Sequence, residues 1–395
     1  MPDATLEVAD IFRQHGPDYR RAHRLPLHQH RLMQAIEACR TPLLGGAVEW
    51  CDHCHFTHIR YRSCRNRHCP KCQGEARLKW LQQRTAELLP TEYFHVVFTL
   101  PDPLAAIAFY NPEVVYAILF RITAETLLTI ARDPQHLGAE IGFFCVLHTW
   151  GQNLHHHPHL HCVVPGGGLS PDGEWISCRP GFFLPVRVLS CLFRRLFLEA
   201  LEKAHATGEL HFFGELESLH DPAAFARYLD PLRDADWVVY AKPPFGGPQK
   251  VLEYLGRYTH RVAISNQRLL SLCDGHVSFR WKDYRHPQRP KVMTVPAEEF
   301  IRRFLLHALP PGFQRIRYYG FLANCHRAGK LEFCRQCLAQ PASDLLPPAA
   351  QCRQLSAILD GLNLRRCPKC GTGTMIRIEV LLPCHGPVPL RVDTS

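Results

Sequence analysis

Six histidines lie between residues 148 and 161, and two of them, His159 and His161, have the spacing of a paired metal site. They flank Leu160 and lead into the apolar stretch Cys162-Val163-Val164, which predicts a β-strand. Residues i and i+2 of a strand point to the same face, so the two imidazoles would lie side by side. The pair could therefore form half of a metal site.

Such a site needs a third protein ligand, for which Gln152, His148 and His157 are the candidates. We favour Gln152. A carboxamide or an imidazole in this place suits a Mg²⁺ or Mn²⁺ ion that must bind and release phosphate oxygens. Three histidines would favour zinc instead.

Two tyrosines, Tyr254 and Tyr258, are four residues apart in a segment that we expect to be helical, which places both phenols on one helix face. Most such pairs are packing residues, but this one lies in a basic segment of a chain that also carries a candidate metal site. A phenol has a pKa of about 10 and is a poor nucleophile at neutral pH. A metal that polarises a phosphodiester makes its attack feasible. The product would be a covalent phosphotyrosine, which stores the energy of the broken bond.

Two cysteine modules predict one or two structural Zn²⁺ ions. The first is Cys51-x2-Cys54-x14-Cys69-x2-Cys72, in which each Cys-x2-Cys knuckle would turn two thiolates toward one ion. Cys64 and His68 lie in the same loop and could replace one ligand. The second joins Cys334 and Cys337 to Cys367 and Cys370 across a longer gap, and its alternative is two unrelated knuckles or free thiols.

The charge of the chain is +10, and residues 251–339 hold 15 basic and 6 acidic residues. A polyanionic partner would explain this excess, although a solvated basic face would look the same. No run of 18 apolar residues and no export signal is present, so we expect no membrane span and read the 18 cysteines as thiols and metal ligands. The candidates for contact with phosphates are Arg65, Arg67, Arg257, Arg261, Lys282 and Arg285.

The elements that must position these residues alternate between strands and helices. Strands are predicted at 93–100, 143–150, 159–164 and 237–241, a hairpin at 269–281 with its turn at Asp274-Gly275, and helices at 77–89, 111–131, 184–205 and 298–307. This order predicts an α+β domain with a mainly antiparallel sheet. The domains expected are 1–90 (helical, zinc-binding and DNA-binding), 91–325 (catalytic) and 326–395 (zinc-ribbon-like).

Strings at 63–72, 150–168, 254–264, 280–285 and 299–305 resemble, in order, those of the two-tyrosine HUH transposases, the rolling-circle insertion-sequence enzymes of the IS-ninety-one type. The resemblance spans roughly residues 10–375. It implies a ferredoxin-like HUH palm with His159 and His161 on its central strand. It also implies that Tyr254 and Tyr258 cleave single-stranded DNA, leaving a 5′-phosphotyrosine and a free 3′-hydroxyl.

The partners implied are single-stranded DNA at the transposon ends and target, and host helicase or replication proteins, because the sequence contains no P-loop motif. The implied location is the bacterial cytoplasm, at the nucleoid during action. Three alternatives share some of these features: an HUH replication initiator or relaxase, a non-catalytic zinc-dependent DNA-binding protein, and a zinc hydrolase. The hydrolase lacks a glutamate base close to the histidines, since Glu140 and Glu174 only flank them at a distance.

Overall fold

The computed structural model describes residues 6–73, 80–81, 84, 87–242, 262–282, 291–338 and 366–384. The chain divides into two compact units. Unit 1 comprises Met1–Lys79, Ile264–Ala308 and Leu346–Ser395, and unit 2 comprises Trp80–Ala263 and Leu309–Leu345. Both ends of the chain thus belong to unit 1, whereas the sequence predicts three consecutive domains. That three-domain division stays a prediction.

Unit 2 is built on a five-stranded sheet in the order β12-β4-β5-β3-β8, in which every neighbouring pair is antiparallel. Its elements are β3 (Tyr93–Thr99), α4 (Asp102–Tyr110), α5 (Pro112–Arg132), β4 (Gly142–Trp150), β5 (His156–Pro165), β6 (Gly167–Leu169), β7 (Trp175–Ser177), α6 (Val186–Ala206), η2 (Gly214–His220), α7 (Pro222–Asp234), β8 (Val239–Lys242), β12 (Ile316–Gly320) and α10 (Arg327–Leu338).

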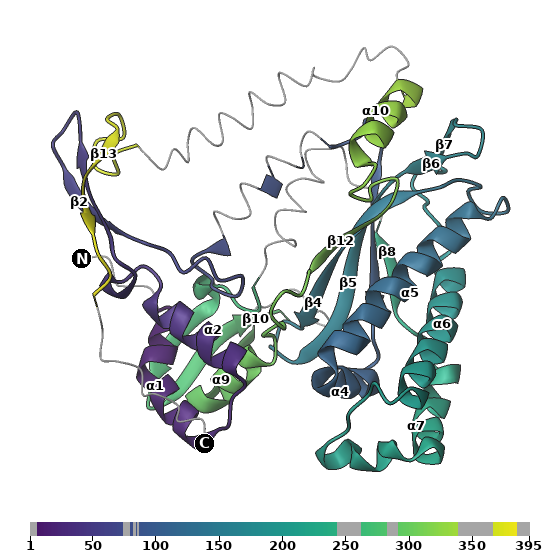
Figure 1. Cartoon of the computed structure of the whole chain (residues 1–395), viewed down its shortest axis with the longest axis horizontal. Coiled ribbons are helices and arrows are strands. Elements are labelled where there is room, and N and C mark those ends of the chain that lie inside the picture. The colour runs from purple at the N-terminus through teal and green to yellow at the C-terminus, as the bar shows by residue number, and fades with distance from the viewer. Residues whose placement is uncertain are drawn as a thin grey trace. The chain divides into compact units, whose positions relative to one another are not determined.

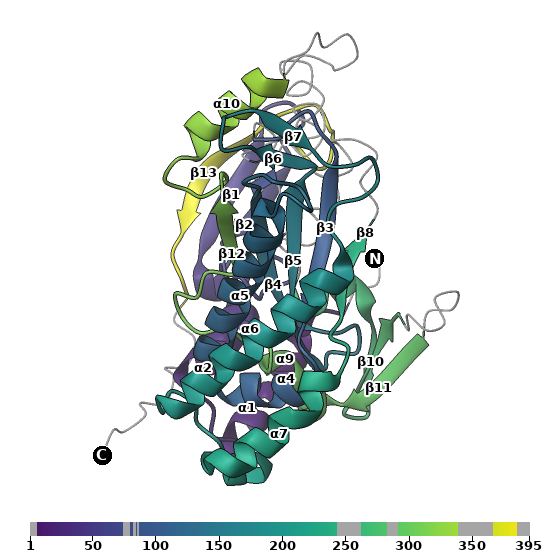
Figure 2. The same ribbon diagram turned by 90° about the vertical axis from the view of Figure 1, so that its right-hand side faces the viewer.

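Helices α5 and α6 cover one face of this sheet (Figure 2). Alternate residues of the strands, among them Phe98 on β3, Leu147 on β4 and Leu160 on β5, are fully buried against these helices. Helix α5 is apolar and long enough to cross a membrane, but 67% of its most apolar window is buried inside the protein. It is the core helix of unit 2, so its composition follows from packing against the sheet.

The opposite face of the sheet presents His95 on β3, His148 on β4, and His159 and His161 on β5, and is called here the histidine face. The histidines and the apolar core lie on opposite faces because successive side chains of a strand alternate between its faces. The residues between these histidines therefore point into the helix-covered core. Further along the same face, Tyr93, Phe144 and Val163 form a smaller apolar cluster.

Unit 1 combines helices and two three-stranded antiparallel sheets, β13-β1-β2 and β11-β10-β9 (Figure 1). Its elements are α1 (Val8–Ala22), α2 (Leu27–Ala38), η1 (Pro42–Leu44), β1 (Gly46–Cys51), β2 (Thr57–Tyr61), η3 (Asn266–Arg268), β9 (Leu269–Cys273), β10 (His276–Trp281), β11 (Lys291–Pro296), α9 (Ala297–Leu305) and β13 (Met375–Leu381).

The core of unit 1 joins segments that are far apart in the sequence. Phe12 of α1 meets Phe304 of α9 edge to face at 5.2 Å between ring centroids, and both rings are buried. The hairpin β9–β10 turns at Asp274 and Gly275, which have φ angles of +49° and +71°. A two-residue turn with both φ values positive matches the twist of the strands, as the Asp-Gly pair predicts.

The predicted elements within the described residues are largely confirmed. The predicted strands correspond to β3, β4, β5 and β8, and the predicted helices at 111–131, 184–205 and 298–307 correspond to α5, α6 and α9. The mixed α+β class with antiparallel sheets is confirmed as well. The ferredoxin-like palm stays a prediction. The expected helix with Tyr254 and Tyr258 lies outside the described residues.

Candidate metal centre

Three imidazoles converge on the histidine face of unit 2. The register of β4 and β5 places His148 opposite His159 and Val146 opposite His161. Ring nitrogens of His148, His159 and His161 lie within 4.8 Å of one another. His148 and His161 are buried, whereas His159 is partly exposed. The three rings can therefore offer one nitrogen each to a common ion at the edge of solvent.

Hydrogen bonds fix the orientation of the two His-x-His rings. Nδ1 of His159 lies 2.6 Å from the carbonyl oxygen of His157, and Nδ1 of His161 lies 2.8 Å from Nε2 of His95. In the tautomer in which Nδ1 carries the proton, both rings donate from Nδ1–H to these acceptors. Nε2 of His159 and Nε2 of His161 then keep the lone pairs that can bind a metal ion. Metal-binding histidines are oriented in this way by their other ring nitrogen. The arrangement therefore fits a divalent cation.

His95 belongs to this site although it lies outside the His159-Leu160-His161 motif. Its ring stacks on that of His161, with 5.0 Å between centroids and 11° between planes, and only 2% of its surface is exposed. Burial first, and then the charges of Lys242 and His159, lower the pKa of His95 to about 3. Nε2 of a neutral His95 can accept a hydrogen bond from Nδ1–H of His161. The sequence places His95 within the predicted strand 93–100, but it does not show that this strand pairs with β5.

The third imidazole is His148, one of the three candidates named from the sequence. Gln152, which we favoured, lies in the turn between β4 and β5, and its part as a ligand stays a prediction. His157 lies with Nδ1 3.8 Å from Oδ1 of Asp102. His156 points to the other side of the sheet, where it contacts the hydroxyl of Tyr116 at 2.8 Å. Three nitrogen donors shift the preference from Mg²⁺ toward Mn²⁺ or zinc.

Most of the predicted DNA-contacting and nucleophilic residues cannot be placed around this centre. Tyr254, Tyr258, Arg257, Arg261 and Arg285 lie outside the described residues. Lys282 is exposed directly after β10 in unit 1. In the same unit Arg65 is exposed, and Arg67 is partly buried, which lowers its pKa.

Two clusters of four cysteines lie in unit 1. Cluster A consists of Cys39, Cys64, Cys69 and Cys72, and cluster B of Cys51, Cys54, Cys367 and Cys370. The Sγ atoms of Cys39 and Cys72 are 3.5 Å apart in cluster A, and those of Cys51 and Cys370 are 3.8 Å apart in cluster B. Four sulfurs bound to zinc at 2.3 Å form a tetrahedron with edges of about 3.8 Å. Both clusters therefore fit a structural zinc ion.

These clusters correct the predicted pairing of the knuckles. Cys51 and Cys54 do not share a cluster with Cys69 and Cys72, because the first knuckle lies at the turn between β1 and β2, where Cys51 pairs with Met375 of β13. Two isolated cysteines, Cys39 and Cys64, complete cluster A instead.

The second predicted module is rearranged in the same way, because Cys367 and Cys370 join the first knuckle in cluster B. Cys334 is buried in α10 among Phe321, Leu322 and Leu331. The Cys337 thiol donates to the carbonyl oxygen of Gly173 at 3.5 Å. Among the described residues, neither of these two cysteines joins a group of three or more possible ligands.

Comparison with known proteins identifies the family. A family described as "Putative transposase" matches residues 142–329, and one described as "Transposase zinc-binding domain" matches residues 11–100. The chain is 63% identical over 393 residues to "Putative transposase y4qJ" of Sinorhizobium fredii (strain NBRC 101917 / NGR234), with 98% of each chain covered. It is 30% identical over 290 residues to "Transposase for insertion sequence element IS801" of Pseudomonas savastanoi pv. phaseolicola, with 73% of this chain and 68% of the relative covered. The chain belongs to the IS-ninety-one-type transposases.

The two family matches of this transposase cover different candidate metal sites. Residues 142–329 contain the three converging histidines, and residues 11–100 contain cluster A and His95. Cys367 and Cys370, which complete cluster B, lie beyond both segments. No solved structure matches the chain.

Proposed function

We propose that this transposase moves its element by a rolling-circle mechanism, in which single-stranded DNA is cut and rejoined through 5′-phosphotyrosine links. The observation that carries the proposal is the convergence of His148, His159 and His161 on one sheet face. The family supports the transposase activity, and the two tyrosines of the sequence supply nucleophiles of the required type. The plasmid-initiator and relaxase alternatives have no such support from the relatives.

The chain's own residues divide the work of the reaction. The imidazoles of His148, His159 and His161 would hold a divalent metal ion, for which their nitrogen donors favour Mn²⁺ over Mg²⁺, and the ion would supply Lewis-acid polarisation of the scissile phosphate. Hydrogen bonds to His95 and to the carbonyl of His157 keep two of these rings in place. Burial of His148 and His161 limits competing water on their side of the site.

Tyr254 or Tyr258 acts as the nucleophile. Its phenol oxygen loses a proton and bonds to phosphorus, the bond from phosphorus to the 3′-oxygen breaks, and that oxygen takes up a proton. The 5′-phosphate is then held on tyrosine, and a 3′-hydroxyl can later attack it to rejoin the strand. The second tyrosine permits a second cleavage while the first link persists. No external energy source is required, because the phosphotyrosine conserves the energy of the phosphodiester.

The decisive test is the formation of a covalent adduct. Labelled single-stranded oligonucleotides that tile both flanks of the gene, on both strands, are incubated with the protein and Mn²⁺, and adducts are detected on a denaturing gel. We expect an adduct with the wild type and none with Tyr254→Phe/Tyr258→Phe. Tyr110→Phe, which alters an exposed tyrosine at the end of α4, is the matched control and should behave as the wild type. An adduct that persists in the double variant would overturn the assignment of the nucleophiles.

A further inference from the structure

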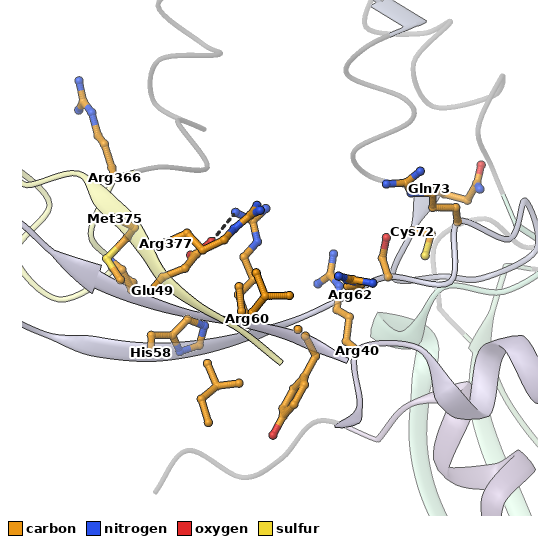
Figure 3. A pocket seen from close by; sticks show the side chains of 18 residues that line it. Arg40, Glu49, His58, Arg60, Arg62, Cys72, Gln73, Arg366, Met375 and Arg377 are labelled. Atoms are coloured by element: carbon orange, nitrogen blue, oxygen red, sulfur yellow. Dashed lines mark ion pairs between the residues drawn. The ribbon is translucent and has the colours of Figure 1, made fainter. Parts of the chain in front are cut away.

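A groove of about 1310 Å³ lies in unit 1, along the sheet formed by β1, β2 and β13 (Figure 3). Cys72 of cluster A and Met375, which is buried beside cluster B, are among its lining residues, so it extends between the two cysteine clusters. Six arginines line it, and Glu49 is the one acid among its 18 described lining residues. We call it the arginine groove; its arginines are Arg40, Arg60, Arg62, Arg65, Arg366 and Arg377.

Strand register explains why these charges gather on one side of the sheet. The central strand β1 places Ala47 opposite Arg60, and Glu49 opposite both His58 and Arg377. Side chains of directly paired residues point to the same face. The small Ala47 thus leaves a trough between longer neighbours. Glu49 lies 3.6 Å from Arg60, between Oε1 and Nη1, and offsets only part of the positive charge (Figure 3).

The distribution of the arginines indicates an extended anion. In Figure 3, Arg40 and Arg62 lie together at the Gln73 end of the groove, whereas Arg60 and Arg377 lie beside Glu49 and Arg366 lies beyond them. A single phosphate would need only one such group. Guanidinium groups bind phosphates through paired hydrogen bonds and remain charged at every physiological pH. A row of them matches a chain of phosphates.

The lining residues of the arginine groove favour base-paired DNA over single-stranded DNA as its ligand. Sites for single strands combine a basic groove with aromatic rings on which successive bases stack. The rings of this groove are those of His58 and Tyr61 alone among the described lining residues. Backbone contacts through arginine, without a stacking ladder, suit a base-paired segment whose bases are turned inward.

We infer that the arginine groove binds the phosphate backbone of duplex DNA. The inference rests on the proposed function in taking the polyanion to be DNA. The groove is built from two distant segments of the chain. Four of its arginines come from residues 40–65, and Arg366 and Arg377 come from the C-terminal segment. That segment is joined to β1 by strand pairing and by cluster B.

The test measures binding of the full-length, zinc-loaded protein to a fluorescent duplex and to its single strand, by anisotropy over a series of salt concentrations. Arg60→Ala/Arg377→Ala should weaken duplex binding about tenfold or more and reduce the slope of log affinity against log salt by about 2. The matched control, Arg21→Ala/Arg195→Ala, removes two exposed arginines from helix ion pairs and should leave both quantities unchanged. Zinc content and thermal unfolding verify that each variant is folded.

A second variant is expected to bind duplex DNA more tightly, a result that a folding defect could not produce. Glu49→Gln removes the carboxylate from the groove, so duplex affinity should rise several-fold. Equal loss in groove and control variants, or no gain from Glu49→Gln, would overturn the inference. A larger loss for the single strand than for the duplex would overturn the duplex assignment. Adduct formation by the wild type reports on the proposed function separately, so either idea can fail alone.

Discussion

At the scale of single residues, the candidate metal centre depends on a side chain outside the His-x-His motif. Nε2 of His95 and Nδ1 of His161 form a hydrogen bond across the pairing of β3 with β5, where Val97 and not His95 is the direct partner of His161. The contact is therefore diagonal between the strands. Such a contact fixes the ring of His161 without occupying the position of a ligand. His95 is in this sense a positioning residue.

We predict that His95→Ala weakens Mn²⁺ binding by about 10- to 100-fold, since a ligand that loses its hydrogen-bond partner loses its orientation. His95→Gln, which keeps an acceptor on the side chain, should recover part of the affinity. Calorimetric titration with Mn²⁺ measures the effect without reference to cleavage. His156→Gln alters a partly buried histidine on the opposite face and serves as the control. Equal affinities for His95→Ala and the wild type would assign His95 to packing alone.

The sequence predicts two of the three converging imidazoles because their spacing is local. Alternation along one strand is enough to pair His159 with His161. The third requires the register between β4 and β5, which places His148 opposite His159. A sequence gives no direct measure of that register, and His148 could be named only as one candidate among three. The same limit hides His95, which lies on a third strand.

At the scale of elements, the pairing of β13 with β1 brings together residues more than 300 positions apart, and cluster B lies at the end of this pairing. A Cys-x2-Cys knuckle shows that two thiolates converge, but it does not identify the other pair. Cys64 could be named from the sequence only as a possible replacement ligand in the loop before Cys69, and Cys39, which belongs to no knuckle, was not named. Three of the four predicted knuckles therefore lie in clusters that fit zinc, the knuckle of Cys334 and Cys337 does not, and the spacing did not reveal which knuckles share an ion.

Cys367→Ser should remove about one zinc ion per chain and release β13 from β1, because a zinc site with three thiolates binds far more weakly than one with four. Zinc content by atomic absorption and amide exchange of β1 measure the two effects. Cys334→Ser is the matched control, since Cys334 packs among apolar side chains and should leave the zinc content unchanged. A loss of zinc in Cys334→Ser would instead favour the predicted pairing of the second module.

At the scale of the whole molecule, the two kinds of metal site belong to different compact units. Clusters A and B lie in unit 1, and the three converging histidines lie in unit 2. The sequence predicts separate zinc and catalytic domains, but it does not predict that residues 264–308 join the chain ends in one unit. That arrangement follows from side-chain packing such as the Phe12–Phe304 contact, for which no local motif exists.

Metal binding should therefore shift the unfolding of each unit separately. A calorimetric scan should show two transitions, and Phe12→Ala identifies that of unit 1, because loss of this buried ring costs about 3–5 kcal/mol. A zinc chelator should lower the same transition. Mn²⁺ at about 100 times its Kd should stabilise unit 2 by about 2.7 kcal/mol, and His159→Gln should abolish that gain. A single transition that both treatments move equally would contradict the assignment, since it would mean that the zinc clusters and the histidine face stabilise one cooperative structure.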